Sequence, residues 1–425
     1  MTINNEHIYY SHQELNTRSY PQFIINKENI LIKVIFDQSN EFDTTELTPR
    51  DVLIQSLKYS PKVIPVIDEN KKVLTCITNN LTQKLDKNFY IIAKTPAKIS
   101  FAGGGSDFTD YLIDGNEGLV LNCAINIFST CTIKTLKKNE LIISTGKKSK
   151  TISIDDLPES SLEDKDFGLI LSVLKLISPN YGINISIATD FPEGSGLGGS
   201  SAVTISILTA LNELQEKKWS REEIAYLAFL SERIIFNITG GWQDQYTSSI
   251  GGLNEIHMSK EGHHLKTVTN SKSILDRLQD HLIITNTGIS RNSGEILRDQ
   301  RKSISNNKLL LESLNKSKEL VPKMVQNILN SRFDKFSDNL KVSGELKKNI
   351  SSGNSSERIK DVYNYAIQSG VKSGRLLGAG SGGHFLFYVD PIDKKEILNK
   401  LNKKGYKSLQ VKINTTGTSA KKVIV

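Results

Sequence analysis

The sequence has few cysteines, and it has no apolar run of the length that targeting or membrane insertion requires. Its three cysteines, Cys76, Cys123 and Cys131, show no C-x-x-C spacing and lie near no histidine cluster. Neither a disulfide framework nor a structural zinc site is therefore predicted, and buried thiols are expected. No N-terminal stretch resembles a signal peptide and no run approaches the length of a membrane span, so we expect a soluble, cytoplasmic protein.

The sequence also lacks internal repeats and any module in which basic and aromatic residues alternate. Its 54 lysines and arginines exceed its 46 acidic residues, which gives a net charge of +8. These basic residues are spread along the chain, so no nucleic-acid partner is expected. An anionic small substrate or a solvated surface accounts equally well for the charge.

The most informative stretch is residues 190–202, which read D-F-P-E-G-S-G-L-G-G-S-S-A. An alternating apolar run at 183–189 precedes it and an apolar helical pattern at 202–214 follows it, which predicts a strand, a glycine loop and a helix start. Glycines let the backbone approach a ligand closely, and the unpaired N–H groups of a helix start favour a phosphate. The stretch therefore predicts an anion site.

Three other glycine-loop interpretations fail. Gly194, Gly196 and Gly199 satisfy G-x-G-x-x-G, but residues 217–223 begin a helix where a dinucleotide-binding fold needs a strand ending in an acidic residue. A protein kinase would need H-R-D, and a Walker A loop would need G-K-S or G-K-T. The remaining alternative to a phosphate loop is a glycine-rich turn without a ligand.

Two further glycine-rich stretches accompany the central one. Residues 95–107 read T-P-A-K-I-S-F-A-G-G-G-S-D, and residues 374–384 read G-R-L-L-G-A-G-S-G-G-H. In order and spacing, the three stretches resemble the three motifs of the GHMP small-molecule kinases. The resemblance implies an α+β fold with ATP and substrate in the cleft between two domains. These are a ribosomal-protein-like α+β domain at 89–280 and a ferredoxin-like α+β domain at 281–425.

The resemblance also implies which residues bind the nucleotide and its metal. The ATP-binding residues would be those of the central loop: Pro192, Gly194, Ser195, Gly196, Leu197, Gly198, Gly199, Ser200 and Ser201. Glu232 would bind Mg²⁺ together with Ser200, because this ion prefers hard oxygen ligands. Ser201 stays an alternative ligand, although aligning the loop on G-L-G-S-S favours Ser200. The alternative for Glu232 is an ion pair with Arg233 or a lysine at the surface.

Asp244 lies twelve residues after Glu232 in the stretch T-G-G-W-Q-D-Q. The resemblance implies that Asp244 is the catalytic base, since phosphoryl transfer needs a carboxylate to receive or orient the hydroxyl proton. Lys98 stands where the family has Lys or Arg, and its charge would hold the transferring phosphate or orient the base. The plain alternatives are that Asp244 caps a helix and that Lys98 is a surface lysine of a strand.

Several residues are candidates for binding the acceptor. Asp107 is suited to accept hydrogen bonds from sugar hydroxyls, although it could instead stabilise its own turn. Residues 287–291, T-G-I-S-R, resemble the branch of the family that phosphorylates D-glycero-D-manno-heptose 7-phosphate, and Arg291 would suit the substrate's phosphate or be an ordinary helix-start arginine. The predicted substrate-binding set is Gly103, Gly104, Gly105, Ser106, Asp107, Gln243, Arg291, Gly380 and Gly382.

Residues 1–88 precede everything that resembles a kinase. A helix from Thr48, a strand at 62–68 and a strand at 73–78 with a turn between the strands weakly resemble half of a CBS-type regulatory module. The alternative is an α/β appendage that packs on the enzyme or mediates a homodimer. The expected arrangement is thus a small N-terminal α/β module followed by two kinase domains.

The resulting hypothesis is ATP-dependent phosphorylation of the anomeric hydroxyl of D-glycero-D-manno-heptose 7-phosphate, which would supply nucleotide-activated heptose for surface polysaccharide. The expected partners are ATP, Mg²⁺ and this sugar phosphate. Two alternatives stay open at this point. The first is a kinase of a free sugar such as L-fucose, and the second is a nucleotide-binding regulator without catalysis.

Overall fold

The computed structural model describes most of the chain after residue 88 and shorter stretches before it. These are residues 8–10, 22–25, 31–35, 41–47, 51–53, 56, 63–67, 71, 73–82, 85, 89–108, 111–112, 116–259, 262–290, 307–350, 356–380 and 382–424. The predicted start of a helix at Thr48 lies outside them. No helix in the described ranges combines the length and the apolar character needed to cross a membrane.

The largest sheet has eight strands around the long strand β8 (Gly118–Thr135), which pairs with β7 (Phe89–Ala102), β11 (Ile183–Thr189) and β12 (Leu253–Ser259). The sequence pattern predicts two separate strands within the range of β8, but the structure has one. The other members are β9 (Glu140–Thr145), β10 (Lys148–Ser153), β13 (Gly262–Thr267) and β18 (Ser419–Ile424).

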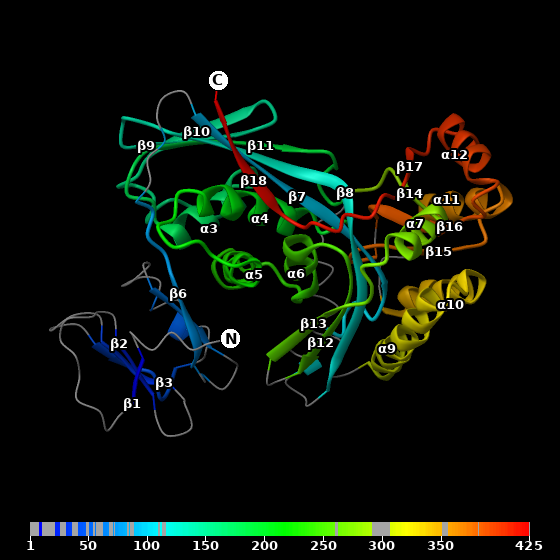
Figure 1. Cartoon of the computed structure of the whole chain (residues 1–425), viewed down its shortest axis with the longest axis horizontal. Helices are drawn as coiled ribbons and strands as arrows, with labels where there is room; N and C mark the ends of the chain where they lie inside the picture. The colour runs from blue at the N-terminus through cyan, green and yellow to red at the C-terminus, as the bar shows by residue number, and fades with distance from the viewer. Residues whose placement is uncertain are drawn as a thin grey trace.

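Four helices cover one side of this sheet (Figure 1). They are α3 (Gly168–Ile177), α4 (Gly199–Asn212), α5 (Arg221–Phe229) and α6 (Gln243–Ile250). Helix α4 packs directly on β7 and β8 and is buried on nearly all sides, with small polar residues among its apolar ones. Residues 220–223, S-R-E-E, predict a capping box at the start of α5, and the structure confirms it: the Ser220 hydroxyl accepts from the Glu223 N–H, and the Glu223 carboxylate accepts from the Ser220 N–H.

The second sheet is antiparallel, with strands in the order β15 (Ser373–Leu376), β16 (His384–Tyr388), β14 (Leu282–Asn286) and β17 (Ser408–Gln410). Helices α9 and α10 pack on each other, and α10 also packs on β15. The helices of this part are α7 (Lys272–Asp280), α9 (Lys308–Leu329), α10 (Phe333–Ile350), α11 (Glu357–Gln368) and α12 (Lys394–Lys403). The predicted two-part α+β class is therefore confirmed.

The last strand, β18, returns to the first sheet and pairs antiparallel with β7, from Ser419 opposite Lys94 to Ile424 opposite Phe89 (Figure 1). Just before it, the Thr418 hydroxyl lies 2.7 Å from the hydroxyls of both Thr95 and Thr209. The sequence pattern predicts a final strand near Leu409 and gives no sign of β18. The domain boundaries at 88 and 280 stay a proposal.

In the N-terminal part, β1 (Ile8–Tyr10), β2 (Gln22–Ile25), β3 (Leu31–Ile35) and β4 (Glu41–Asp43) form a four-stranded sheet. The predicted hairpin is confirmed as β5 (Val63–Ile67) and β6 (Val73–Thr78), paired antiparallel. Its apolar residues join the same buried cluster as those of α3, α4 and α5. The hairpin is thus packed against the helices of the first α+β part.

Polar contacts complete this attachment at the end of β6. The buried Asn79 amide donates to the Ile177 carbonyl at 2.6 Å and accepts from the Gln215 amide at 3.0 Å. The indole of Trp219, the residue before the N-cap of α5, donates to the Thr78 carbonyl at 2.7 Å. Buried hydrogen bonds of this kind are costly to break, because the partner groups stay desolvated.

We therefore expect Asn79→Ala to lower the free energy of unfolding by about 1–3 kcal/mol, since two buried partners lose their hydrogen bond. Asn80→Ala is the matched control, because the exposed Asn80 side chain donates to Glu216 at the surface and should cost less than about 0.5 kcal/mol. Thermal unfolding by calorimetry measures both. Equal melting temperatures for the two variants would contradict a structural role of the Asn79 contacts.

Candidate functional site

The predicted phosphate loop lies between β11 and α4, as the sequence pattern requires. Gly194, Gly196 and Gly198 have φ values of 68°, 74° and 70°, a left-handed conformation that only glycine adopts readily. Helix α4 begins at Gly199, and no side chain caps it. Its first N–H groups and its dipole are therefore available to an anion at the loop.

The third glycine stretch packs directly on this loop. A Cβ atom at Gly196 would lie 2.9 Å from the Leu377 carbonyl oxygen, and one at Gly383 would lie 2.4 Å from the Ser195 carbonyl oxygen. The buried His384 ring contacts the same Ser195 oxygen through Nδ1 at 2.8 Å. This stretch contains two residues of the predicted substrate-binding set. Gly380 is in a left-handed conformation (φ 94°), and Gly382 lies against the Ile289 carbonyl.

Other predicted members of the phosphate loop have distinct positions. Pro192 is exposed, whereas Ser195 and Leu197 are buried. The Leu197 carbonyl accepts from the Lys98 N–H at 2.9 Å, which connects the loop to β7. The Ser290 hydroxyl donates to the Glu193 carbonyl at 2.8 Å, which connects it to the end of β14. Arg291, the predicted phosphate ligand, lies outside the described residues.

Glu232 lies in a one-turn π-helix, η2 (Leu230–Ile235), that continues α5. Such turns often occur at functional sites because they re-aim one side chain. Glu232 is fully buried, and its Oε2 accepts from the Ser200 hydroxyl at 2.9 Å and lies 3.4 Å from an Arg233 nitrogen. Its Oε1 accepts from the Gln245 amide at 3.1 Å. The structure thus brings Ser200 and Glu232 together. The ion pair between Glu232 and Arg233 is also present, but it is buried and does not lie at the surface.

The electrostatic setting of Glu232 is a balance of opposing effects. Burial raises the pKa of its carboxyl group, whereas the charge of Arg233 and hydrogen bonds from neighbouring hydroxyl and amide groups lower it. Ser201 is also buried in the first turn of α4.

The carboxylate oxygen of Glu232 and the hydroxyl oxygen of Ser200 are ligands of the type that Mg²⁺ accepts. No group of three His, Cys, Asp or Glu residues suited to a metal occurs in the described part of the chain.

Lys98 and Asp244 form a close ion pair, with 2.7 Å between Nζ and Oδ1. Lys98 comes from β7 and is buried, while the Asp244 side chain, on the first turn of α6, keeps 27% of its surface exposed. A Cβ at Gly198 would lie 3.1 Å from Lys98 Cγ and 3.5 Å from Asp244 Cγ. The ion pair is therefore directly beside the phosphate loop, with its carboxylate accessible.

Asp107 and Gln243 form the adjoining side of the site. Asp107 is buried and its carboxylate accepts from the Gly105 N–H at 3.0 Å and from the Gln243 side chain at 3.0 Å. The Gln243 oxygen in turn accepts from Lys98 at 3.4 Å. The Ser106 hydroxyl donates to the Gly103 carbonyl at 2.7 Å, so it stabilises the loop itself. Asp107 thus stabilises its own turn, one of the two roles considered for it, and the other role, accepting hydrogen bonds from sugar hydroxyls, stays a prediction.

Sequence analysis does not single out Lys347 and Arg375, two buried cations near the same carboxylates. Burial, followed by the charges of Arg375 and Lys98, lowers the pKa of Lys347 to about 7, while Asp107 and Asp244 act in the opposite direction. Burial also lowers the pKa of Arg375 to about 10. Arg375 lies inside the third glycine stretch, whose pattern indicates a backbone loop and not a charged side chain. Lys347 lies in a lysine-rich helix that resembles a solvated one.

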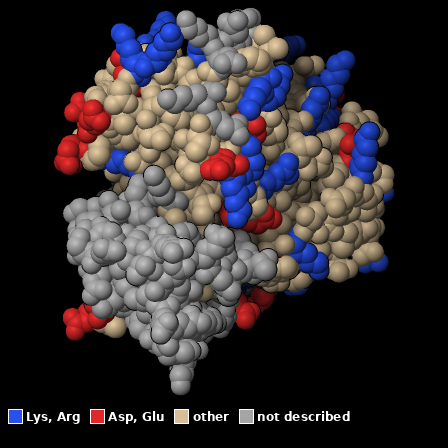
Figure 2. All heavy atoms as spheres, turned by 60° about the vertical axis from the view of Figure 1, so that its left-hand side comes forward, with Lys and Arg blue, Asp and Glu red and all other residues tan. Residues whose placement is uncertain are grey.

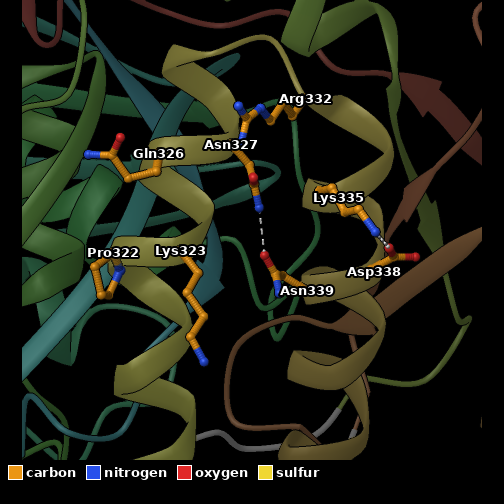
Figure 3. A pocket seen from close by; sticks show the side chains of 8 residues that line it. All are labelled: Pro322, Lys323, Gln326, Asn327, Arg332, Lys335, Asp338 and Asn339. Carbon is orange, nitrogen blue, oxygen red and sulfur yellow. Dashed lines mark hydrogen bonds and ion pairs between the residues drawn. The ribbon is translucent and has the colours of Figure 1, made fainter.

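The surface outside this site offers weaker candidates. Figure 2 shows Lys and Arg side chains in several groups on one face, with acidic side chains beside some of them. An open hollow between α9 and α10 is lined mainly by residues of polar or charged type, and it contains no residue of the three glycine stretches (Figure 3). Its lining consists of Pro322, Lys323, Gln326, Asn327, Arg332, Lys335, Asp338 and Asn339.

Comparison with known proteins gives two family matches. Residues 168–252 match the GHMP kinases N-terminal domain, and residues 324–407 match the GHMP kinases C-terminal domain. A D-glycero-alpha-D-manno-heptose 7-phosphate kinase of Campylobacter jejuni is 28% identical over 323 residues, which cover 74% of this chain and 94% of that protein. The bifunctional fucokinase/GDP-fucose pyrophosphorylase of Arabidopsis thaliana is 26% identical over 335 residues, 72% of this chain and 30% of that protein.

The fold has solved counterparts as well. A D-glycero-D-manno-heptose 1-phosphate kinase from Bacteroides thetaiotaomicron superimposes with a TM-score of 0.64 at 24% identity, over 79% of this chain and all of that one. Fold and sequence relationships together define a phosphotransferase, which transfers a phosphoryl group from ATP to an alcohol group of a sugar. The chain belongs to the GHMP kinase superfamily.

The packing of Gly198 allows a test of the loop. Gly198→Ala should reduce kcat/KM by about tenfold or more, because the new methyl group would lie 3.1 Å from Lys98 Cγ and 3.3 Å from its Cε and would shift the lysine that pairs with Asp244. Gly146→Ala is the matched control: Gly146 also has positive φ (58°), but a Cβ there meets no atom within 4 Å. Both variants should lose about 1–2 kcal/mol of stability from backbone strain, and only Gly198→Ala should lose activity. Steady-state kinetics measure kcat/KM for both variants, and an equal loss in the two would contradict this geometry.

Proposed function

We propose that this sugar kinase phosphorylates the anomeric hydroxyl of D-glycero-D-manno-heptose 7-phosphate with ATP. The observation that carries the proposal is the Lys98–Asp244 ion pair between the phosphate loop and the G-G-G-S-D loop. The 28% identity to a heptose 7-phosphate kinase over most of both chains supports the choice of acceptor. The product would be a 1,7-bisphosphate, suited to the synthesis of nucleotide-activated heptose and surface polysaccharide in the cytoplasm.

In this proposal the phosphate loop binds the ATP phosphates through the uncapped N–H groups of α4. Glu232 and Ser200 would hold Mg²⁺, and nucleotide phosphates and water would supply its other ligands. When bound, the ion would neutralise charge on the transferring phosphoryl group. The contact of 2.9 Å between the Ser200 hydroxyl and the Glu232 carboxylate supports this role, because it holds two hard oxygen ligands together at the start of α4.

Asp244 would accept the proton of the anomeric hydroxyl. The anomeric oxygen attacks the γ-phosphorus of ATP at the same time, and the bond from this phosphorus to the β-phosphate oxygen breaks. Lys98 would hold the Asp244 carboxylate in place through the 2.7 Å ion pair. Asp107, held by Gln243 and the Gly105 N–H, would accept a hydrogen bond from a neighbouring sugar hydroxyl. Because phosphoryl transfer depends mainly on position and charge, these few groups suffice.

The proposed base can be tested by Asp244→Asn, which keeps the shape of the side chain and removes its charge. We expect kcat to fall by about 10²–10⁴-fold, while the affinity for ATP measured by calorimetry stays within about twofold. Unchanged turnover would remove Asp244 from this role. Loss of ATP affinity to the same extent as turnover would indicate damage to the loop instead.

The proposed metal site predicts a change in Mg²⁺ dependence. Glu232→Gln should raise the Mg²⁺ concentration for half-maximal activity by about tenfold or more, because an anionic ligand is lost. Since burial raises the pKa of Glu232, wild-type Mg²⁺ affinity should weaken as the pH falls, and the variant should show less of this dependence. Titration of ATPase-coupled turnover with MgCl₂ at several pH values measures both. Identical Mg²⁺ curves would exclude Glu232 as a ligand.

The acceptor itself is tested by incubating the wild-type protein with ATP, Mg²⁺ and a panel of sugars and sugar phosphates, with mass analysis of the products. A heptose bisphosphate formed from the 7-phosphate is the expected result. Turnover of L-fucose instead would favour the second candidate, which the 26% identity to a bifunctional fucokinase supports. The N-terminal part as a CBS-like module or homodimer contact remains a separate proposal, open to sedimentation analysis with and without adenine nucleotide.

A further inference from the structure

His384 is the first residue of β16, and its side chain contacts the phosphate loop. The residue is 7% exposed, and its Nδ1 lies 2.8 Å from the Ser195 carbonyl oxygen. A carbonyl oxygen carries no hydrogen atom, so the proton of this contact belongs to Nδ1. Burial lowers the pKa of the imidazole more than this hydrogen bond raises it, so the ring is neutral at pH 7. His384 therefore donates one hydrogen bond to the loop as its Nδ1–H tautomer.

The backbone around His384 is held by the second sheet. The His384 carbonyl accepts from the Leu377 N–H at 2.9 Å, and the Gly383 N–H donates to the Ile289 carbonyl at 2.8 Å. The Gly383 carbonyl accepts from both the N–H and the hydroxyl of Thr287, at 2.8 Å and 2.9 Å. A donor on a rigid element keeps its direction better than a donor on a free loop. The sheet thus fixes the direction in which the imidazole donates.

The carbonyl that His384 holds belongs to the peptide unit between Ser195 and Gly196. In a planar trans peptide the C=O and N–H groups point in opposite directions, so this hydrogen bond also fixes the direction of the Gly196 N–H, away from β16. Gly196 is only partly buried, and its N–H donates to no group among the described residues. The Gly196 N–H is therefore available to an anion.

This peptide unit needs a contact that holds it, because glycine constrains it little. Gly196 has a φ of 74°, and a glycine reaches other φ values at little cost. Rotation of the unit by half a turn would exchange the positions of the N–H and the carbonyl oxygen. A backbone N–H attracts a phosphate, whereas a carbonyl oxygen repels it, because both oxygens carry negative charge. The orientation of this one unit therefore affects how well the loop binds an anion.

We propose that His384 is a positioning residue of the phosphate loop, which holds the Ser195 carbonyl toward β16 and thereby directs the Gly196 N–H toward the phosphate groups of ATP. This inference rests on the proposed binding of ATP at this loop and deepens it. His384 acts through the backbone of the loop in this arrangement, and Asp244 and Lys98 remain responsible for the transfer.

The test compares His384→Phe with His384→Asn. Phenylalanine keeps a ring but has no donor, whereas the asparagine amide carries an N–H on a nitrogen bonded to Cγ, as histidine does at Nδ1. The Kd of ATP, measured by calorimetry with Mg²⁺ and without acceptor, should rise by about 3–10-fold in His384→Phe, as expected for the loss of one hydrogen bond. It should stay within about twofold of the wild type in His384→Asn. In steady-state kinetics, KM for the acceptor should change by less than about twofold in both variants.

His281→Phe is the matched control. His281 Nδ1 lies 3.0 Å from the Val389 carbonyl oxygen, so it makes the same kind of contact. In the β14–β16 pair, Leu282 lies opposite Tyr388 and Asn286 opposite His384, which places the two histidines at opposite ends of the pair. His281→Phe should therefore lose stability without a change in the Kd of ATP. Equal losses of ATP affinity in His281→Phe and His384→Phe would overturn the proposal and assign the effect to the stability of the sheet.

Two further results would overturn the proposal. One is an unchanged Kd of ATP in His384→Phe, and the other is the same loss in His384→Asn as in His384→Phe, which would assign the effect to ring packing. Melting temperatures show whether each variant folds. If His384→Phe does not fold, His384→Gln takes its place, because its amide lies one bond farther from the backbone. His384→Gln should then lose ATP affinity relative to His384→Asn, and equal affinities in these two would overturn the proposal.

Failure of the proposed function is distinguishable from failure of this inference. If the wild type bound no ATP in calorimetry, the proposed function would fall, and the inference would fall with it. If the wild type bound ATP and phosphorylated its acceptor, and His384→Phe bound ATP equally well, the function would stand and the role of His384 alone would be wrong.

Discussion

The start of helix α4 is the constraint on which the rest of the structure depends. Its first N–H groups can bind a phosphate only if no side chain occupies the space in front of them. Gly196 and Gly378, in the loops that follow β11 and β15, let these loops pack backbone against backbone: a Cβ at Gly378 would lie 2.5 Å from the Gly196 Cα. The two α+β parts can therefore meet at the phosphate loop only through backbone without side chains.

Burial of charge is the second organising principle of the site. Glu232 and Asp244 each face a cation from a neighbouring position, Arg233 and Lys98, and each also lies beside the phosphate loop. Charges held in a low-dielectric region interact strongly and do not reorganise during the reaction. The same burial makes the loss of either partner expensive, because the charge that is left behind stays desolvated.

Features whose signal is local in the chain could be predicted from the sequence. The phosphate loop, the capping box at Ser220 and the β5–β6 hairpin each depend on residues a few positions apart, so their pattern can be read directly. Lys347 and β18 depend on contacts between distant segments, and their own patterns resemble a solvated helix and a charged tail. Packing of α10 against β7, which buries Lys347, has no local signature in the sequence.

The N-terminal hairpin shows how a distant segment reaches the site through such packing. Thr78 accepts a hydrogen bond from Trp219, the residue before the N-cap Ser220, and α5 continues without interruption into the π-helix that carries Glu232. The hairpin's apolar side chains share one core with α5. A displacement of the hairpin would therefore move the start of α5. Because the other end of this helix carries Glu232, the attachment of β5 and β6 is connected to the position of the proposed metal ligand.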